Sequence, residues 1–360
     1  MGATNTPLPH YQHAPPTKEN LVWANLAIID LAKASTAEGR AELAPLARDA
    51  MRNIGFFYVV NHGLSQAEVD RVFDIADLPF SQTSDSEKQE YSERVLETGS
   101  YQGYKARQYW HLDGGVYDQI EGYTINRDVY KKQHPPALRP FLPELSEFTK
   151  HNHSIVHTLL RLLAVGLELP EDTFVDKHNW AADGETNVRF MKYHPRSQEE
   201  EDKSNQVWLK GHTDIGSISI LWSQPVAGLQ ILSREGDWKW IRHIDNALII
   251  NTGDCLQFLS GGFYTPTIHR VIQPPVDQRG HTRLGVYYFS MPDDDVQLAP
   301  IGGLSASEAL RARLLDGDFP TVNVWRKGRT RAHGKTELKK SQEKGVEEEI
   351  ISGVVVKHYS

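Results

Sequence analysis

The amino-acid sequence predicts a mainly β protein in which helices frame one β core. Helical periodicity dominates the chain before residue 170, and short apolar runs separated by turn residues dominate after it. Strands and helices do not alternate as they would in a parallel α/β sheet. Several short strands with turn signals are typical of a sandwich or barrel.

The first half of the chain carries the framing elements. Residues 1–20 are rich in Pro, His and Thr and predict an extended N-terminal arm, and residues 21–170 predict a mixed, helical region that packs on the core. The elements expected there are strands at residues 27–31 and 56–60, a helix opened by a capping box of Ser35 and Glu38, a helix opened by a capping box of Ser65 and Glu68, and a long helix over residues 142–167.

Residues 171–325 are expected to form the β core. The candidate strands are residues 188–190, 218–222, 229–232, 238–241, 247–250, 269–272 and 284–289. The last segment, residues 326–360, is highly charged, and we expect a solvated tail or helix face there. Within it, the run Val354-Val355-Val356 could dock on the core.

Composition and charge exclude several classes of function. A net charge of −8 disfavours nucleic acid as a partner. The single cysteine, Cys255, excludes an intramolecular disulfide framework and any multi-cysteine metal site. No apolar run approaches the ~18 residues of a membrane span, and neither a secretory signal nor a phosphate-binding glycine motif is present. We therefore expect a cytoplasmic protein with no membrane, nucleic-acid or obligate protein partner.

The segment Gly211-His212-Thr213-Asp214 carries the strongest chemical signal. Alternate residues of an extended chain point to the same side, so His212 and Asp214 can present a nitrogen and a carboxylate oxygen to one point. His269 opens another candidate strand far along the chain. Two histidines and one carboxylate are the ligand set of a facial triad for non-haem Fe(II), which leaves three positions open.

The H-x-D pattern is weak by itself. With 16 histidines in the chain, the pattern could arise by chance. A His–Asp pair on the surface, or one that forms its hydrogen bonds within the core, is then the stronger interpretation. Its context favours a metal, because Gly253-Asp254 and Ser260-Gly261-Gly262 precede His269, and Arg283 begins a strand beyond it. A cation beside an open iron site is what a dicarboxylate co-substrate needs.

Together these motifs resemble those of the iron(II)- and 2-oxoglutarate-dependent oxygenases of the isopenicillin N synthase-like family. The family pattern of H-x-D, G-D-x-L-Q-x-x-S-x-G, H-R-V and a later Arg is matched by His212-Thr213-Asp214, residues 253–262, His269-Arg270-Val271 and Arg283. Residues 55–63, which read Gly-Phe-Phe-Tyr-Val-Val-Asn-His-Gly, resemble the family's N-terminal segment. The resemblance covers about residues 20–325.

The resemblance implies a double-stranded β-helix (jelly-roll) core that uses Fe(II), 2-oxoglutarate and O2. His212, Asp214 and His269 would bind the iron. Arg283 would pair with the distal carboxylate of 2-oxoglutarate, and the Tyr193 hydroxyl would be a second contact. The implied enzyme is a dioxygenase that hydroxylates, desaturates or cyclises a small molecule in natural-product biosynthesis and releases succinate and CO2.

The resemblance also suggests how the substrate is held. Phe289 falls where relatives place an aromatic side chain against the substrate. Arg189 lies on the candidate strand that carries Tyr193, and it is either a surface charge or a contact for an acidic substrate.

Two departures from the family pattern concern the co-substrate. The family has R-x-S where this chain has Arg283-Leu284-Gly285, so the serine hydroxyl that would share the carboxylate is absent. One hydrogen bond fewer would weaken co-substrate binding by roughly one decade. In addition, Met191 replaces the family's Asn.

Other functions stay open on this basis. One is an Fe(II) oxidase that does not use 2-oxoglutarate, as isopenicillin N synthase does not. Another is a pyrimidine hydroxylase similar to fungal thymine hydroxylases. A non-catalytic binding protein on the same scaffold would have no need of a complete triad.

Overall fold

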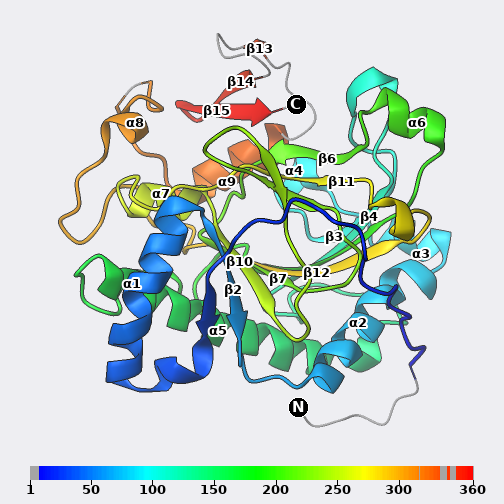
Figure 1. Ribbon diagram of the computed structural model, residues 1–360, viewed down its shortest axis with the longest axis horizontal. Coiled ribbons are helices and arrows are strands. Elements are labelled where there is room, and N and C mark those ends of the chain that lie inside the picture. Colours follow the sequence, from blue (N-terminus) through cyan, green and yellow to red (C-terminus); the bar gives the residue numbers. More distant parts are fainter. Residues whose placement is uncertain (1–7, 316, 333–338, 341–345, 360) are drawn as a thin grey trace.

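Two β-sheets face each other at the centre of the computed structural model, which describes residues 8–315, 317–332, 339–340 and 346–359 (Figure 1). The eight-stranded sheet has the order β1 (Ile28–Asp30), β2 (Phe56–Val60), β10 (Leu248–Thr252), β7 (Ile218–Trp222), β12 (Arg283–Ser290), β5 (Asn187–Tyr193), β4 (Ile120–Asn126) and β3 (Gly103–Lys105). The seven-stranded sheet has the order β13 (Lys339–Lys340), β14 (Val346–Ile351), β15 (Val354–Tyr359), β6 (Val207–His212), β11 (His269–Ile272), β8 (Leu229–Leu232) and β9 (Trp238–Trp240).

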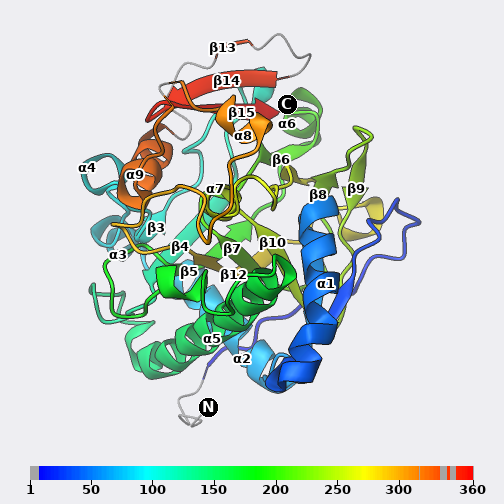
Figure 2. The same cartoon turned by 90° about the vertical axis from the view of Figure 1, so that its left-hand side faces the viewer.

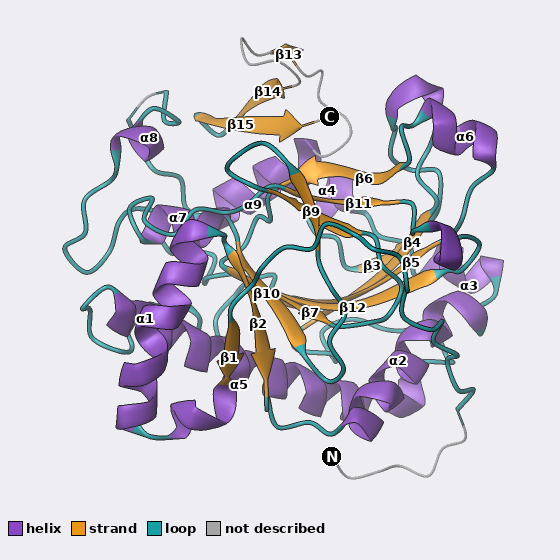
Figure 3. Cartoon of the chain, viewed as in Figure 1, coloured by secondary structure: helices purple, strands orange, loops and turns teal. Residues whose placement is uncertain are grey.

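Three long helices cover the outer face of the eight-stranded sheet: α1 (Ala37–Asn53), α2 (Gln66–Ser81) and α5 (Leu142–Gly166) (Figures 1 and 2). The shorter helices are α3 (Asp85–Glu90), α4 (Val95–Thr98), α6 (Gln198–Lys203), α7 (Asp254–Leu259), α8 (Glu308–Arg311) and α9 (Val322–Ala332). Figure 3 shows these helices in purple around the orange strands. The predicted mainly β fold with framing helices is confirmed. No helix in the described part of the chain combines the length and apolar character that crossing a bilayer requires.

Strand β2 shows how the core is layered. Phe57 and Val59 join the main apolar cluster between the eight-stranded sheet and the helices. Phe56 and Tyr58 point the other way and join the cluster between the two sheets. Because alternate side chains of a strand face opposite sides, a strand buried on both faces reads as a continuous apolar run, as residues 56–60 do.

Most predicted elements are present. Strands β7, β8 and β11 have the predicted bounds, and Ser65 and Glu68 form the predicted capping box of α2. The capping box predicted at Ser35 and Glu38 is wrong. Residues 31–35 form a 3-10 helix in which the Ser35 hydroxyl donates to Ala32 O, and Thr36 caps α1 instead by accepting from Gly39 N.

The N-terminal half does more than frame the core, because it contributes β1, β2, β3 and β4 to the eight-stranded sheet. Of the predicted N-terminal arm, residues 1–7 lie outside the described residues, and residues 8–20 contain neither helix nor strand.

The charged C-terminal segment is not simply solvated, so that prediction is wrong for several of its residues. Arg326 of α9 is buried and pairs with Asp294. Val354 and Val356, which alternate along β15, join the main core. Strand β15 also reaches the edge of β6, where Tyr359 pairs with Gly211. Residues 333–338, 341–345 and 360 of this segment lie outside the described residues.

Acid should destabilise this fold through buried histidines, of which His178 is the clearest. Its Nδ1 lies 2.8 Å from Phe174 O and its Nε2 lies 2.9 Å from Ser217 Oγ. Burial lowers the pKa of His178 from 6.5 to about 4. Between these two pKa values the unfolded chain binds the extra proton, so stability must fall as the pH decreases from about 6.5 toward 4.

We expect His178 alone to remove about 2 kcal/mol of unfolding free energy between pH 7 and pH 5. The measurement is urea unfolding of wild type and His178→Gln at both pH values, in which the variant should lose less stability on acidification. His281→Gln, at an exposed position, is the control and should keep the wild-type difference. An equal acid loss in wild type and His178→Gln would contradict the prediction.

Candidate metal centre

Three of the residues singled out by the sequence meet at one point. His212 ends β6 and His269 begins β11, and the two are direct partners across this antiparallel pair. Asp214 follows β6, and its Oδ1 lies 3.9 Å from His212 Nε2 and 3.7 Å from His269 Nε2. Among the described residues, these three alone form a group of potential ligands whose atoms all lie within 4.8 Å of one another. The group could hold a metal ion.

Backbone carbonyls orient the two imidazole rings. Nδ1 of His212 lies 2.8 Å from Lys210 O, and Nδ1 of His269 lies 3.1 Å from Thr267 O. A carbonyl can only accept, so the proton of each neutral ring sits on Nδ1 and Nε2 keeps its lone pair. Hydrogen bonds of this kind, from the outer ring nitrogen to a backbone carbonyl, commonly orient histidine ligands of a metal.

Asp214 is oriented in the same way. Its Oδ2 accepts hydrogen bonds from Ser219 Oγ at 2.5 Å and from Asn251 Nδ2 at 2.7 Å, which leaves Oδ1 facing the histidines. Burial alone would raise the pKa of the Asp214 carboxyl, but interaction with His269 and His212 and the two hydrogen bonds hold this pKa below its usual range. Burial lowers the pKa of His212 to about 4. At neutral pH the site therefore offers a carboxylate and a neutral His212 imidazole, which is the protonation state that metals bind.

The loop between His212 and Asp214 is held from the C-terminal end of the chain. Arg329 of α9 donates a hydrogen bond to Thr213 O at 3.1 Å, and its Nη1 lies 3.7 Å from Asp254 Oδ2. Asp254, the first residue of α7, accepts from Thr213 Oγ1 and donates its own backbone N–H to Asp214 O. Sequence reasoning missed Arg329, because it lies within a charged run that is typical of a solvated surface.

His212, Asp214 and His269 line a cavity of about 250 Å³. Tyr193, Phe289 and Arg189 all line it, as do Tyr101 and Trp110. The Arg189 guanidinium lies 4.6 Å from the Tyr101 ring centroid and 5.0 Å from that of Phe289. Arg189 is therefore a cation in the cavity wall and not a surface charge.

Arg283 lies beyond one end of this cavity. It is 2% exposed and pairs across the strands with Tyr193, whose ring centroid lies 5.3 Å from the guanidinium carbon. Its Nη1 donates to Tyr287 Oη at 3.1 Å and its Nε to Val226 O at 3.3 Å. Tyr193 and Tyr287 line the main cavity, whereas Arg283 borders a smaller adjoining pocket. Tyr287 was not singled out from the sequence, although its period-two spacing from Arg283 and Phe289 was an available signal.

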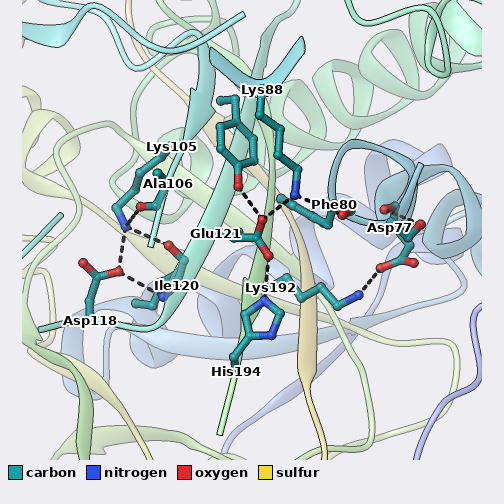
Figure 4. Close-up of polar contacts among 12 residues, drawn as sticks. Asp77, Phe80, Lys88, Lys105, Ala106, Asp118, Ile120, Glu121, Lys192 and His194 are labelled. Carbon is teal, nitrogen blue, oxygen red and sulfur yellow. Dashed lines mark hydrogen bonds and ion pairs between the residues drawn. The ribbon is translucent and has the colours of Figure 1, made fainter. Parts of the chain in front are cut away.

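Lys105 and Asp118 form a buried ion pair (Figure 4). The pair supports the segment that carries Trp110, a residue of the cavity wall. Lys105 and Asp118 are 4% and 1% exposed, and Lys105 Nζ donates to Asp118 Oδ1 at 2.7 Å and to Ile120 O at 2.8 Å. Asp118 Oδ2 accepts from the backbone N–H groups of Tyr109 and Trp110. The Lys105 ammonium also lies 4.1 Å from the Trp110 ring centroid. The same ion pair therefore contacts both the backbone and the ring of Trp110.

Removal of the Asp118 carboxylate should lower the free energy of unfolding strongly. Asp118→Ala leaves the Lys105 ammonium buried without its anion, and we expect a loss of about 3–5 kcal/mol in unfolding free energy. Glu147→Ala, which breaks the exposed Lys150–Glu147 pair, is the matched control and should cost at most about 1 kcal/mol. Urea unfolding measures both variants, and equal losses would contradict the assigned role of the buried pair.

Comparison with protein families gives two matches. The family model described as the 2OG-Fe(II) oxygenase superfamily matches residues 185–292, which include His212, Asp214, His269 and Arg283. The model described as the N-terminal region of non-haem dioxygenases in morphine synthesis matches residues 26–144.

Two relatives match most of the chain. The chain is 29% identical over 286 residues to a UPF0676 protein of Schizosaccharomyces pombe, covering 76% of this chain and 84% of that protein. It is 28% identical over 296 residues to the flavonol synthase/flavanone 3-hydroxylase of Eustoma exaltatum, covering 80% of this chain and 82% of the relative. Among solved structures, a Neurospora crassa protein in complex with alpha-KG and thymine has a TM-score of 0.74 at 22% identity, over 88% of this chain and 98% of that chain. This structural likeness shows a shared fold, and the predicted jelly-roll core is confirmed.

Proposed function

Because the chain belongs to the superfamily of 2-oxoglutarate- and iron(II)-dependent oxygenases, we propose that His212, Asp214 and His269 are its iron ligands. The enzyme is a 2-oxoglutarate-dependent dioxygenase. The observation that carries the ligand assignment is the convergence of Asp214 Oδ1 with the Nε2 atoms of both histidines. These three atoms stay available because the hydrogen bonds of the same side chains engage Nδ1 of each histidine and Oδ2 of Asp214.

We further propose that Arg283 and Tyr193 bind the distal carboxylate of 2-oxoglutarate. Arg283 is a buried cation, and no carboxylate of the described residues pairs with it. Burial raises the pKa of Tyr193, so its hydroxyl remains a neutral donor. When bound, iron(II) supplies the redox chemistry by which O2 and 2-oxoglutarate yield succinate, CO2 and one oxygen atom for the substrate.

The chain's own residues orient the substrate and exclude water. Tyr101, Trp110 and Phe289 offer aromatic faces, and Arg189 offers a cation between two of them. Asn187 also lines the cavity, and within the described part of the chain its Oδ1 is buried without a hydrogen-bond partner. We therefore propose a ring-containing small molecule that accepts a hydrogen bond from Arg189 and donates one to Asn187.

Two substrate classes have this chemistry. Hydroxylated aromatic natural products, such as those of the flavonoid class after which one relative is named, are the first. A free pyrimidine is the second, because its neighbouring N–H and C=O groups match an amide oxygen and a guanidinium, and the Neurospora crassa structure holds thymine. The catalytic unit proposed here is residues 171–325, with residues 21–170 packed against it.

The test is succinate formation by the Fe(II)-loaded protein with each substrate class. The expected result is succinate in equal amount to a product that has gained one oxygen atom or lost two hydrogens. Thymine-dependent turnover would select the pyrimidine class, and turnover with flavanones the natural-product class. Substrate oxidation without succinate would overturn the proposed co-substrate site and favour an Fe(II) oxidase.

A further inference from the structure

Gly285 and Met191, the two departures from the family pattern, face each other in the structure. In the antiparallel pair of β12 and β5, Arg283 lies opposite Tyr193, Gly285 opposite Met191 and Tyr287 opposite Arg189. Alternate residues of a strand share a face, so these six residues lie on one face of the sheet. The two departures are therefore neighbours in the co-substrate region and not independent changes.

Gly285 is required here for space and not for its backbone conformation. Its φ lies outside the left-handed region that favours glycine. A Cβ built on Gly285 would meet the Tyr287 side chain, at 2.5 Å from Cε2, 2.7 Å from Oη and 2.8 Å from Cζ. Any side chain at position 285 would therefore displace the Tyr287 ring. Met191 adds an apolar contact, because it belongs to the cluster against which Tyr287 packs.

The Tyr287 hydroxyl lies beside Arg283, where it could donate a hydrogen bond to a carboxylate that pairs with this arginine. It accepts a hydrogen bond from Arg283 Nη1 at 3.1 Å, and a hydroxyl that accepts still has its own proton to donate. Tyr287 also lines the main cavity, whereas Arg283 borders the adjoining pocket, so the phenol connects the buried cation to the space where ligands bind.

We propose that Tyr287 supplies the hydroxyl that the missing serine would have supplied to the distal carboxylate of 2-oxoglutarate, and that Gly285 is the space this exchange requires. The inference rests on the proposed co-substrate site at Arg283 and Tyr193. It makes Tyr287 a binding residue, with Gly285 and Met191 as the neighbours that position its ring. The expected weakening of co-substrate binding by the loss of serine would then be offset.

The experiment titrates two 2-oxo acids into the anaerobic Fe(II) protein and follows the visible charge-transfer absorption. 2-Oxoglutarate has the distal carboxylate, and pyruvate lacks it but has the same chelating end. Tyr287→Phe should raise the Kd for 2-oxoglutarate about tenfold and leave that for pyruvate unchanged. Tyr58→Phe is the matched control. Tyr58 lies on β2 of the same sheet, and its buried hydroxyl donates to Arg242 O, so this variant should change the Kd of neither 2-oxo acid.

Variants at Gly285 test the steric half of the proposal. Gly285→Ala should displace Tyr287 and reproduce the tenfold loss, and combining it with Tyr287→Phe should add little, because both changes remove the same contact. The double variant Gly285→Ser with Tyr287→Leu should restore 2-oxoglutarate binding to near the wild-type value. Thermal unfolding of each variant separates a loss of contact from a loss of fold.

The outcomes distinguish this inference from the proposed function. If wild type binds 2-oxoglutarate and Arg283→Met does not, but Tyr287→Phe binds with the wild-type Kd, the role of Tyr287 is overturned and the co-substrate site stands. Equal losses for pyruvate and 2-oxoglutarate in Tyr287→Phe would also overturn it, because the distal carboxylate would not be involved. Absence of a saturable band in wild type would overturn both proposals.

Discussion

Asp214→Ala is expected to abolish iron(II) binding at the concentrations that saturate the wild type. The carboxylate is the one anion of the three-residue centre, and its Oδ1 faces both histidines. Loss of outer partners of metal ligands already lowers affinity by about 10–100-fold, and loss of a ligand should exceed this range. Iron content after anaerobic loading and desalting, together with the absence of a charge-transfer band on addition of 2-oxoglutarate, is the measurement.

The chain contains its own control for this variant. Asp245 follows His243 with the same spacing, but it bonds to that histidine at 2.9 Å and its side chain is 92% exposed. Asp245→Ala should bind iron as the wild type does. Retention of stoichiometric iron by Asp214→Ala would refute the assigned ligand set.

Arg283→Met is expected to have the second largest effect, a rise of about 100-fold or more in the Kd for 2-oxoglutarate with iron binding intact. Methionine keeps much of the buried volume but cannot pair with a carboxylate, and loss of one partner of a buried, hydrogen-bonded charge pair costs about 2–5 kcal/mol. The charge-transfer titration measures the Kd, and pyruvate should bind Arg283→Met and wild type alike.

Arg270→Met is the matched control for this variant. Arg270 lies on strand β11 of the seven-stranded sheet, where it packs over the Trp238 ring and donates to Gln230, away from the cavity lining. This variant should keep the wild-type Kd for 2-oxoglutarate. A similar loss in both arginine variants would indicate a general disturbance of the barrel and contradict a specific carboxylate contact.

The H-x-D pattern shows how far the sequence alone could go. It occurs at His111-Leu112-Asp113, His212-Thr213-Asp214 and His243-Ile244-Asp245. Among the described residues, only the second lies beside a third ligand, because β6 pairs with β11 and places His212 opposite His269. Local sequence cannot specify that pairing, which joins residues far apart in the chain. From the sequence alone, the accompanying motifs and the family resemblance are what distinguish the second pattern from the other two.

Other features depended on contacts without a local signal. Strands buried on both faces, such as β2, were predictable because continuous apolar runs mark them. The Lys105–Asp118 pair and the position of Arg326 were not, because charged residues are exposed far more often than buried. The Ser35 error was local, since Ser35 and Thr36 are both good caps and the preceding 3-10 helix decided between them.

The contact of Arg329 with Thr213 joins residues that are synthesised at different times. The ribosome synthesises the loop of His212 and Asp214 long before Arg329, yet the hydrogen bond to Thr213 O comes from that late residue. A chain that ends before Arg329 lacks this restraint between His212 and Asp214. We therefore expect a C-terminal truncation to affect the proposed iron site as well as the edge of the fold.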